Sequence, residues 1–252
     1  MTFDIDQAWL QATLLAGVRL AAFMVLAPPF SHQAIPRQVR AILAVSLGLV
    51  VSSRVAPTYE PVGTATFFAH VVAEAATGAM LGALVMIVFS AVTAAGSHLD
   101  LFGGFSVGMA FDPQTNVSGS QFTRLFALAT VVLMFTSDAY QLIIAGLARS
   151  FNALPVGGGL TLDAELLVTG VSQMFLAALQ IAGPLVVVLF LADVGLGLLT
   201  RVAPQLNAFA LGFPLKILIT LTMGTFLYLG LPGVVSSLTD RALDLMGGAA
   251  GG

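Results

Sequence analysis

The chain has 252 residues, of which 58% are hydrophobic and only 8% are charged, and its mean hydropathy is +1.00. A soluble domain carries about 25% charged residues, so this chain is too apolar to cover its own surface with polar groups and is predicted to be a membrane protein. The absence of cysteine excludes disulfides, thiol chemistry and cysteine-ligated metals. The net charge is −3 and the nine basic residues are dispersed singly, which leaves no basic patch for nucleic acid.

Six apolar segments approach the roughly 20 residues that a spanning helix needs. In chain order they are residues 9–26, 39–52, 67–93, 125–146, 168–200 and 209–231. The second is short for a complete span and the fifth is long. Pro184 and Pro214 fall inside segments, and each is expected to kink its helix unless neighbouring groups bond the freed carbonyl. The pattern predicts an all-α membrane protein.

Two local patterns predict how parts of these helices pack. Gly78 and Gly82 stand four residues apart among alanines, which gives one face small enough for a second helix to approach closely. Residues 234–246 are weakly amphipathic, a pattern compatible with a segment that lies at the membrane interface.

A glycine-rich stretch at 96–124, GSHLDLFGGFSVGMAFDPQTNVSGSQFTR, interrupts the apolar pattern. A connector of this length is uncommon unless it is functional or disordered. This one contains too many apolar residues to prefer water: Leu99, Leu101, Phe102, Phe105, Val107, Met109 and Phe111. An irregular apolar loop between membrane helices is therefore expected, and it suggests a pore lining or a plug.

Five charged residues fall within the apolar segments: Arg19, Glu74, Asp138, Asp193 and Lys216. Each would cost roughly 2.5 to 3.5 kcal/mol if it faced lipid at the bilayer centre, so some of them must face protein or water. Either they form structural ion pairs or lie near the membrane surface, or they mark a polar path through the molecule. Asp193 and Lys216 are almost equidistant from the loop tip at 204–205, so in an antiparallel hairpin they would lie at similar depth. We expect these two charges to neutralise each other.

Enzyme signatures are absent from the sequence. His32, His70 and His98 are scattered, without an H-E-x-x-H pair, and no G-x-S-x-G elbow or phosphate-binding loop occurs. Asp100 and Asp112 lie in the expected loop without an accompanying base, and Asp112-Pro113 is better interpreted as a turn. The sequence therefore predicts a protein that is not an enzyme and that has no cofactor or metal.

Several blocks together resemble the FliR family of flagellar export proteins, with the injectisome counterpart SctT as a more distant relative. The most specific blocks are GLLTRVAPQLN at 197–207, the following Phe209, and GFPL at 212–215. Less specific matches are Ala27-Pro28, IPRQVR at 35–40, the central loop ending at Asp112-Pro113, and FNALPVG at 151–157. The blocks occur in the expected order over nearly the whole chain. Lys216 departs from the family pattern, in which the position after GFPL is commonly uncharged.

The resemblance implies a subunit that forms, with FliP and FliQ homologues, the export gate of a type III secretion apparatus. It implies bent helical hairpins: a FliP-like part at residues 1–158 and a FliQ-like hairpin with a short tail at 159–252. Unfolded flagellar subunits would pass through the assembled pore, in the bacterial inner membrane at the flagellar basal body. The cytoplasmic mouth, near FlhB, would be formed by Arg201, Pro204, Gln205 and Asn207.

The resemblance also implies that the central loop, at about 97–123, enters the pore and helps to close it. The plug would be formed by Phe105, Met109, Phe111, Asp112 and Pro113. In this interpretation Phe105, Met109 and Phe111 seal the constriction, where apolar groups also resist ions by dewetting. The hinges that let the backbone move aside would be Gly103, Gly104 and Gly108. The alternative for these residues is ordinary packing of a loop onto helices.

Three other functions remain as alternatives. The first is an injectisome export gate subunit, which only family likeness separates from the flagellar one. The second is a secondary transporter, in which broken helices and buried charges form a binding site at the midplane. The third is a purely structural scaffold.

Overall fold

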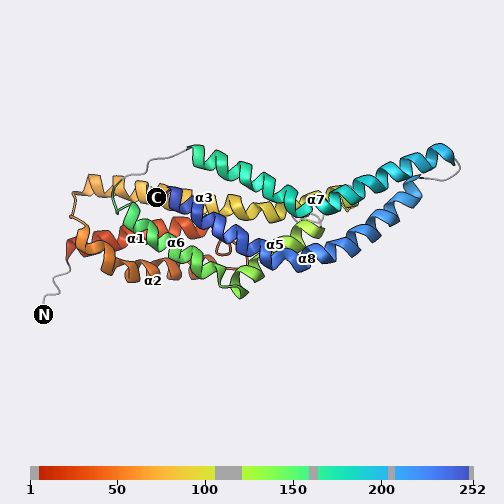
Figure 1. Ribbon diagram of the computed structural model, residues 1–252. Helices are drawn as coiled ribbons and strands as arrows, with labels where there is room; N and C mark the ends of the chain where they lie inside the picture. The colour runs from red at the N-terminus through yellow and green to blue at the C-terminus, as the bar shows by residue number, and fades with distance from the viewer. Residues whose placement is uncertain (1–5, 106–120, 159–163, 204–207, 250–252) are drawn as a thin grey trace. The chain divides into compact units, whose positions relative to one another are not determined.

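Helices are the regular secondary structure of the part of the chain that Figure 1 describes, in a computed structural model that covers residues 6–105, 121–158, 164–203 and 208–249. In chain order the elements are α1 (Gln7–Leu26), α2 (Arg37–Val55), the 3-10 turn η1 (Ala56–Thr58), α3 (Thr64–Gly103), α5 (Gln121–Thr136), α6 (Ala139–Ala153), α7 (Ala164–Val202) and α8 (Ala208–Ala249). The all-α class predicted from the sequence is confirmed.

Within these ranges five helices are long and apolar enough to cross a membrane. They are Gln7–Leu26, Arg37–Thr58, Thr64–Gly103, Glu165–Val202 and Ala210–Ala249. They correspond to the first, second, third, fifth and sixth predicted segments. The helix α7 continues through Pro184, and α8 continues through both Pro214 and Pro232.

The fourth predicted segment, 125–146, is two helices instead of one. The helix α5 ends at Thr136, α6 begins at Ala139, and the two are bent by 73°. At the corner Asp138 has φ 59° and ψ 11°, a left-handed conformation that aspartate adopts more readily than most residues. Its Oδ1 accepts a hydrogen bond of 2.9 Å from Gln141 Nε2. The expectation of one continuous segment was wrong here because a polar residue with a local partner turns the chain.

The glycine-rich stretch that begins at Gly96 is also more helical than expected. The helix α3 extends to Gly103, so the first part of the predicted loop is its last two turns. Gly96 serves helix packing there, because a Cβ at this position would lie 2.8 Å from the carbonyl oxygen of Phe122 in α5. Residues 96–103 lie in α3 and residues 121–124 lie in α5, which corrects the prediction of an irregular segment at both of its ends.

The predicted close packing at Gly78 and Gly82 is confirmed. A Cβ at Gly78 would overlap the backbone oxygen of Arg19, and one at Gly82 would lie 2.8 Å from that of Phe23. The two glycines of α3 therefore receive the backbone of α1 with no room for a side chain. This contact brings the charged groups of the two helices within reach of each other.

The chain forms two compact units, and neither is a single stretch of sequence. The first unit comprises residues 1–88, 134–171 and 238–252, and the second comprises 89–133 and 172–237. The helices α3, α7 and α8 each contribute to both. The predicted boundary at 158/159 concerns likeness to FliP and FliQ and stays a prediction.

The end of α8 belongs to the core of the first unit. Leu238, Ala242 and Leu245 are buried there. A Cβ at Gly146 of α6 would lie 2.7 Å from the side chain of Leu243, so α6 and α8 pack closely. The interfacial interpretation of residues 234–246 was therefore wrong, because their apolar face is covered by protein.

Candidate functional site

The two ends of the central loop are held together by one carboxylate in the second unit. Asp100, in the last turn of α3, accepts hydrogen bonds from the backbone N–H groups of Phe122 and Thr123, both at 2.9 Å, and from the Thr123 hydroxyl at 2.7 Å. The N–H groups in the first turn of a helix have no partner within that helix, and a negative charge is favourable there. Asp100 therefore caps α5 from a neighbouring helix, and at 2% exposure it is buried.

Aromatic packing reinforces this connection. The ring of Phe105 meets that of Phe122 edge to face, with centroids 5.3 Å apart, and Phe122 meets Phe126 in the same way at 6.2 Å. Phe105, predicted as a sealing residue, thus lies packed where the loop leaves α3. Its predicted role in closing a pore stays a prediction.

The first two predicted hinges also make close contacts. A Cβ at Gly103 would lie 2.7 Å from the Thr220 hydroxyl, and Gly104, with φ +83°, lies against the ring of Phe213. Glycine is required at Gly104 because other residues rarely adopt that conformation. We define the loop base as Asp100, Gly103, Gly104, Phe105, Phe122 and Thr123. The remaining plug and hinge predictions, Gly108, Met109, Phe111, Asp112 and Pro113, lie outside the described residues.

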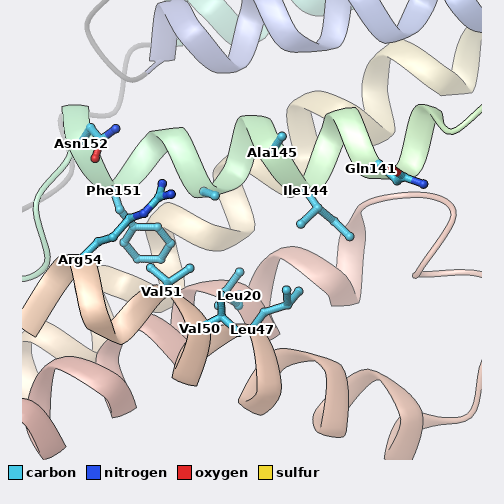
Figure 2. A pocket seen from close by; sticks show the side chains of 11 residues that line it. Leu20, Leu47, Val50, Val51, Arg54, Gln141, Ile144, Ala145, Phe151 and Asn152 are labelled. Carbon is cyan, nitrogen blue, oxygen red and sulfur yellow. The ribbon is translucent and has the colours of Figure 1, made fainter.

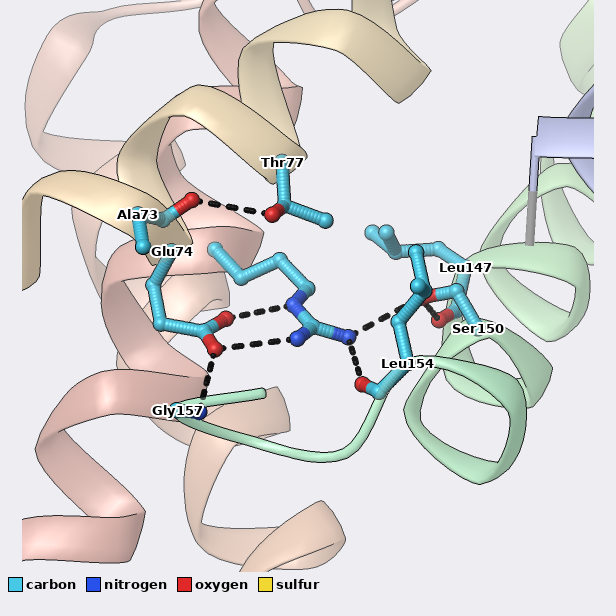
Figure 3. A network of polar contacts seen from close by, with 8 residues as sticks. Ala73, Glu74, Thr77, Leu147, Ser150, Leu154 and Gly157 are labelled. Carbon is cyan, nitrogen blue, oxygen red and sulfur yellow. Dashed lines mark hydrogen bonds and ion pairs between the residues drawn. The ribbon is translucent and has the colours of Figure 1, made fainter. Parts of the chain in front are cut away.

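In the first unit a buried ion pair joins α1 and α3, as Figure 3 shows. Arg19 Nη2 donates to Glu74 Oε1 at 3.0 Å, and Arg19 Nε donates to Glu74 Oε2. The two side chains are only 1% and 2% exposed. A buried charge is tolerated when it is paired and its remaining hydrogen-bonding groups are satisfied. Two of the five predicted charges in apolar segments are therefore partners in a structural ion pair.

Further contacts extend this network to α6 and the turn that follows it. Arg19 Nη1 donates to the carbonyl oxygen of Leu154 at 2.9 Å, and its guanidinium carbon lies 4.3 Å from the centroid of the Phe151 ring. The N–H of Gly157 donates to Glu74 Oε1 at 3.0 Å. Gly157 has φ +80°, and a Cβ there would lie 2.7 Å from His70 Nδ1. The FNALPVG block therefore ends α6 and forms the turn whose backbone groups make further hydrogen bonds to the ion pair.

The carboxylate of Glu74 also influences the hydroxyl of Tyr59, a residue that lies outside the candidate spans. Burial, and secondly the negative charge of Glu74, raise the pKa of the Tyr59 hydroxyl. The hydroxyl lies 3.4 Å from Gln11 Oε1. Tyr59 is therefore a neutral donor near neutral pH.

In the second unit Lys216 and Asp193 form the ion pair expected from their equal distance to the loop tip. Lys216 Nζ lies 2.7 Å from Asp193 Oδ1 and 2.8 Å from Oδ2. The pair is far more open than the first, with side chains 22% and 45% exposed for lysine and aspartate. The hypothesis that these two charges neutralise each other is confirmed.

The other predicted site residues are not gathered into one place. Asp138 lies exposed at the α5–α6 corner, bonded to Gln141. Arg201 is exposed in the last turn of α7, and Pro204, Gln205 and Asn207 lie outside the described residues. Within the described ranges no group of three or more His, Cys, Asp or Glu side chains is placed to hold a metal ion.

The sequence reasoning missed the role of Asp100, which it weighed only as a possible partner for Asp112. A carboxylate close to an apolar segment indicates that hydrogen-bond donors must lie nearby to compensate for its burial. The donors, however, are backbone groups about two dozen residues further along the chain, and side-chain patterns do not reveal those.

Comparison with known proteins identifies the family of the chain. The sequence model of the family described as bacterial export proteins, family 1, matches residues 10–243. This chain belongs to that family. It is similar to the flagellar biosynthetic protein FliR of Escherichia coli (strain K12), with 31% identity over 238 residues that cover 93% of this chain and 89% of the relative.

Two further relatives place the family more closely. FliR of Bacillus subtilis (strain 168) is 30% identical over 217 residues, covering 84% of each chain. The surface presentation of antigens protein SpaR of Shigella flexneri is 27% identical over 215 residues, covering 82% of each. The chain is a membrane component of a type III export apparatus.

Proposed function

We propose that this chain is the FliR-type subunit of the flagellar type III export gate in the inner membrane. Together with FliP and FliQ homologues it forms part of the pore through which unfolded flagellar subunits are secreted, with FlhB near the cytoplasmic mouth. Residues 1–158 supply the FliP-like part and 159–252 the FliQ-like hairpin. The observation that carries the proposal is the loop base, which fixes both ends of a loop whose residues match the family's plug.

The loop base supports the plug interpretation because its contacts fix the two ends of the loop, while the residues proposed to seal the pore lie between those ends. Asp100 and the Phe105–Phe122 contact hold the ends of the loop together. In this proposal Met109 and Phe111 are the residues that close the pore, while the base stays in contact with α8. Gly108 is then the hinge of this proposal, because Gly103 and Gly104 are packed against Thr220 and Phe213.

The exposed apolar surface supports a subunit that has partners. The most apolar windows of Glu165–Val202 and Ala210–Ala249 are only 28% and 17% buried, against 61% in Thr64–Gly103. Large apolar side chains such as Phe226 and Leu229 stand exposed on α8. Lipid and neighbouring subunits must cover this surface, as a hetero-oligomeric gate requires.

The relatives favour a flagellar role over an injectisome role. The similarity to E. coli FliR extends over 93% of this chain at 31% identity, whereas that to Shigella SpaR extends over 82% at 27%. The ion pair of the first unit argues against a secondary transporter, because Arg19 and Glu74 are already satisfied by each other, by Leu154 and by Gly157. A midplane substrate site would need polar groups that remain available.

Copurification tests the gate. The chain is coexpressed with its FliP and FliQ homologues, and an affinity tag on FliP is used to purify the assembly from intact membranes. We expect this chain to be recovered with FliP and to be degraded when it is expressed alone. Recovery of this chain as a stable, separate species, with none on tagged FliP, would refute the gate.

A deletion inside the loop tests the plug separately. Removing residues 108–113 leaves the loop base intact, so the folded helices should persist. We expect ions to leak through membranes that contain the assembled complex, measured as proton flux into vesicles. The matched control deletes residues 115–119 and should leak less. Tight membranes with normal secretion after the first deletion would return the loop to the role of a connector.

A further inference from the structure

A groove of about 360 Å³ lies in the first unit between α2 and α6, with Leu20 of α1 at its floor. Figure 2 shows part of its lining: Leu47, Val50 and Val51 come from α2, while Ile144 and Ala145 come from α6. Ala148 of α6 also lines the groove. This volume is within the range of about 300–1,000 Å³ typical of small-molecule sites. The groove is thus large enough for a ligand, and its middle is apolar.

The groove is open to the surroundings of the helices. Val50 on its rim is 70% exposed, and Ala145 is exposed as well. The space exists because α6 presents alanines where longer side chains would have filled it. In a membrane protein, an open apolar groove of this kind must be covered by lipid or by a partner chain.

Polar side chains stand at the two ends of the groove. Arg54 and Asn152 lie together at one end and Gln141 lies at the other, as Figure 2 shows. Gln141 is bonded to Asp138. Arg54 is exposed, and none of the hydrogen bonds and ion pairs found among the described residues involves it. One end of the groove therefore carries a guanidinium that is free to bind an anion.

No carboxylate of the described residues lies within ion-pair distance of Arg54. Phe151, which lines the groove beside Arg54, has the guanidinium of Arg19 near its ring. That second charge is neutralised by Glu74 in the buried ion pair. Arg54 is therefore the charged side chain at this end that has no ion-pair partner among the described residues.

The positions of the groove residues along α2 correspond to the headgroup and acyl-chain layers of a bilayer. The candidate span that contains α2 is Arg37–Thr58, so Arg54 is near its end and Leu47 near its middle. A separation of seven positions corresponds to about 10 Å of helix, and half the hydrocarbon core is about 15 Å thick. A long arginine side chain near a helix end reaches the headgroup level, while Leu47 stays at acyl-chain depth.

We propose that the groove binds an anionic glycerophospholipid. One acyl chain lies along Leu47, Val50 and Ala148, and the phosphate accepts hydrogen bonds from Arg54 and the side-chain amide of Asn152. Basic pockets between membrane helices are suited to anionic headgroups. A helix of a partner chain is about 10 Å wide, so it would lie across the rim and leave the groove itself unfilled. The proposal requires only that the chain is a membrane protein, and it is independent of the pore.

Lipid titration monitored by native mass spectrometry tests this site. The full chain, purified with its partner subunits in a mild detergent, is titrated with phosphatidylglycerol and with phosphatidylcholine of identical acyl chains. We expect tighter binding of phosphatidylglycerol. Arg54→Gln should weaken its binding about tenfold, which corresponds to about 1.4 kcal/mol, because a hydrogen bond from a charged group is lost. Ala148→Leu, which fills the groove, should weaken the binding of both lipids.

Arg149→Gln is the matched control, because Arg149 is an exposed arginine of α6 that does not line the groove. It should bind both lipids as the unmodified chain does. If Ala148→Leu lowers the yield, Arg54→Gln decides alone, because Arg54 is exposed. The proposal is overturned if Arg54→Gln binds phosphatidylglycerol normally, or if Arg149→Gln loses as much binding. It is also overturned if Ala148→Leu releases the partner subunits while lipid binding is unchanged, since the groove would then be a protein interface.

Discussion

Among the described residues an ion pair can be identified in each of the two units, and these two pairs differ in burial and in their further partners. Arg19 and Glu74 are 1% and 2% exposed and are surrounded by further donors and acceptors from α6 and its following turn. Lys216 and Asp193 are 22% and 45% exposed and bridge only the two arms of one hairpin. The first pair fixes how separate helices meet, whereas the second offsets two charges that the hairpin places at equal depth.

This difference teaches that the position of a charge in an apolar segment does not reveal its role. Breaking a buried pair leaves an uncompensated charge and costs about 3–5 kcal/mol, whereas exposed pairs contribute about 0.2–1 kcal/mol. The variants below test whether burial or pairing is the decisive property.

The largest effect is expected from Arg19→Ala. This change leaves Glu74 buried with only the Gly157 N–H as a partner, and it should destabilise the first unit by about 3–5 kcal/mol. The measurement is thermal unfolding of the purified chain in detergent. The double variant Arg19→Met with Glu74→Leu should recover much of the loss, because replacing both charges by apolar groups is often neutral. A double variant as unstable as the single one would show that packing alone, and not the charge, is lost.

Asp100→Ala separates burial from ion pairing. Asp100 is as buried as Glu74, yet its partners are the neutral N–H groups of Phe122 and Thr123. Leaving buried donors without an acceptor costs about 1–3 kcal/mol, so we expect a smaller loss than for Arg19→Ala. Hydrogen exchange should show faster exchange at the first turn of α5, with α1 unchanged. Equal protection in the variant and the unmodified chain would contradict the role of Asp100 as a cap.

The smallest effect is expected from Lys216→Met, at about 1 kcal/mol or less, because the pair is partly exposed. Asp193→Asn should have a similar effect. The charge-swapped variant, with Asp193→Lys and Lys216→Asp, should restore the stability that either single reversal loses, as measured by thermal unfolding in detergent. If the swap rescues neither reversal, the contact between the two side chains contributes nothing to stability.

The same two pairs show what the sequence can predict. Asp193 and Lys216 could be paired because one hairpin tip sets the depth of both, so counting residues was sufficient. Arg19 and Glu74 are 55 residues apart with another helix between them in the sequence, and no count relates their positions. Their contact depends on Gly78 receiving the backbone of α1. The sequence did predict that close approach, but not which helix would make it.

The limits of helices were predicted less well than their existence. The turn at Asp138 was hidden because the flanking residues are as apolar as those of a single span. The last turns of α3 were mistaken for loop because Gly96 and Gly103 signal flexibility in isolation, whereas in the fold they permit contact with α5 and α8. Glycine in an apolar segment can indicate either a flexible loop or close helix packing, and only the position of the neighbouring helix distinguishes the two.

The burial of the end of α8 has a consequence for the biosynthesis of the chain. Leu238, Ala242 and Leu245 complete a core whose other members include Leu15 and Leu81. Proteins leave the ribosome from the amino terminus onward, so the first helices to enter the membrane must wait for the last one before their unit can close. During that interval their apolar faces depend on lipid or on insertion factors, and an interrupted translation product would expose the surface that quality-control proteases recognise.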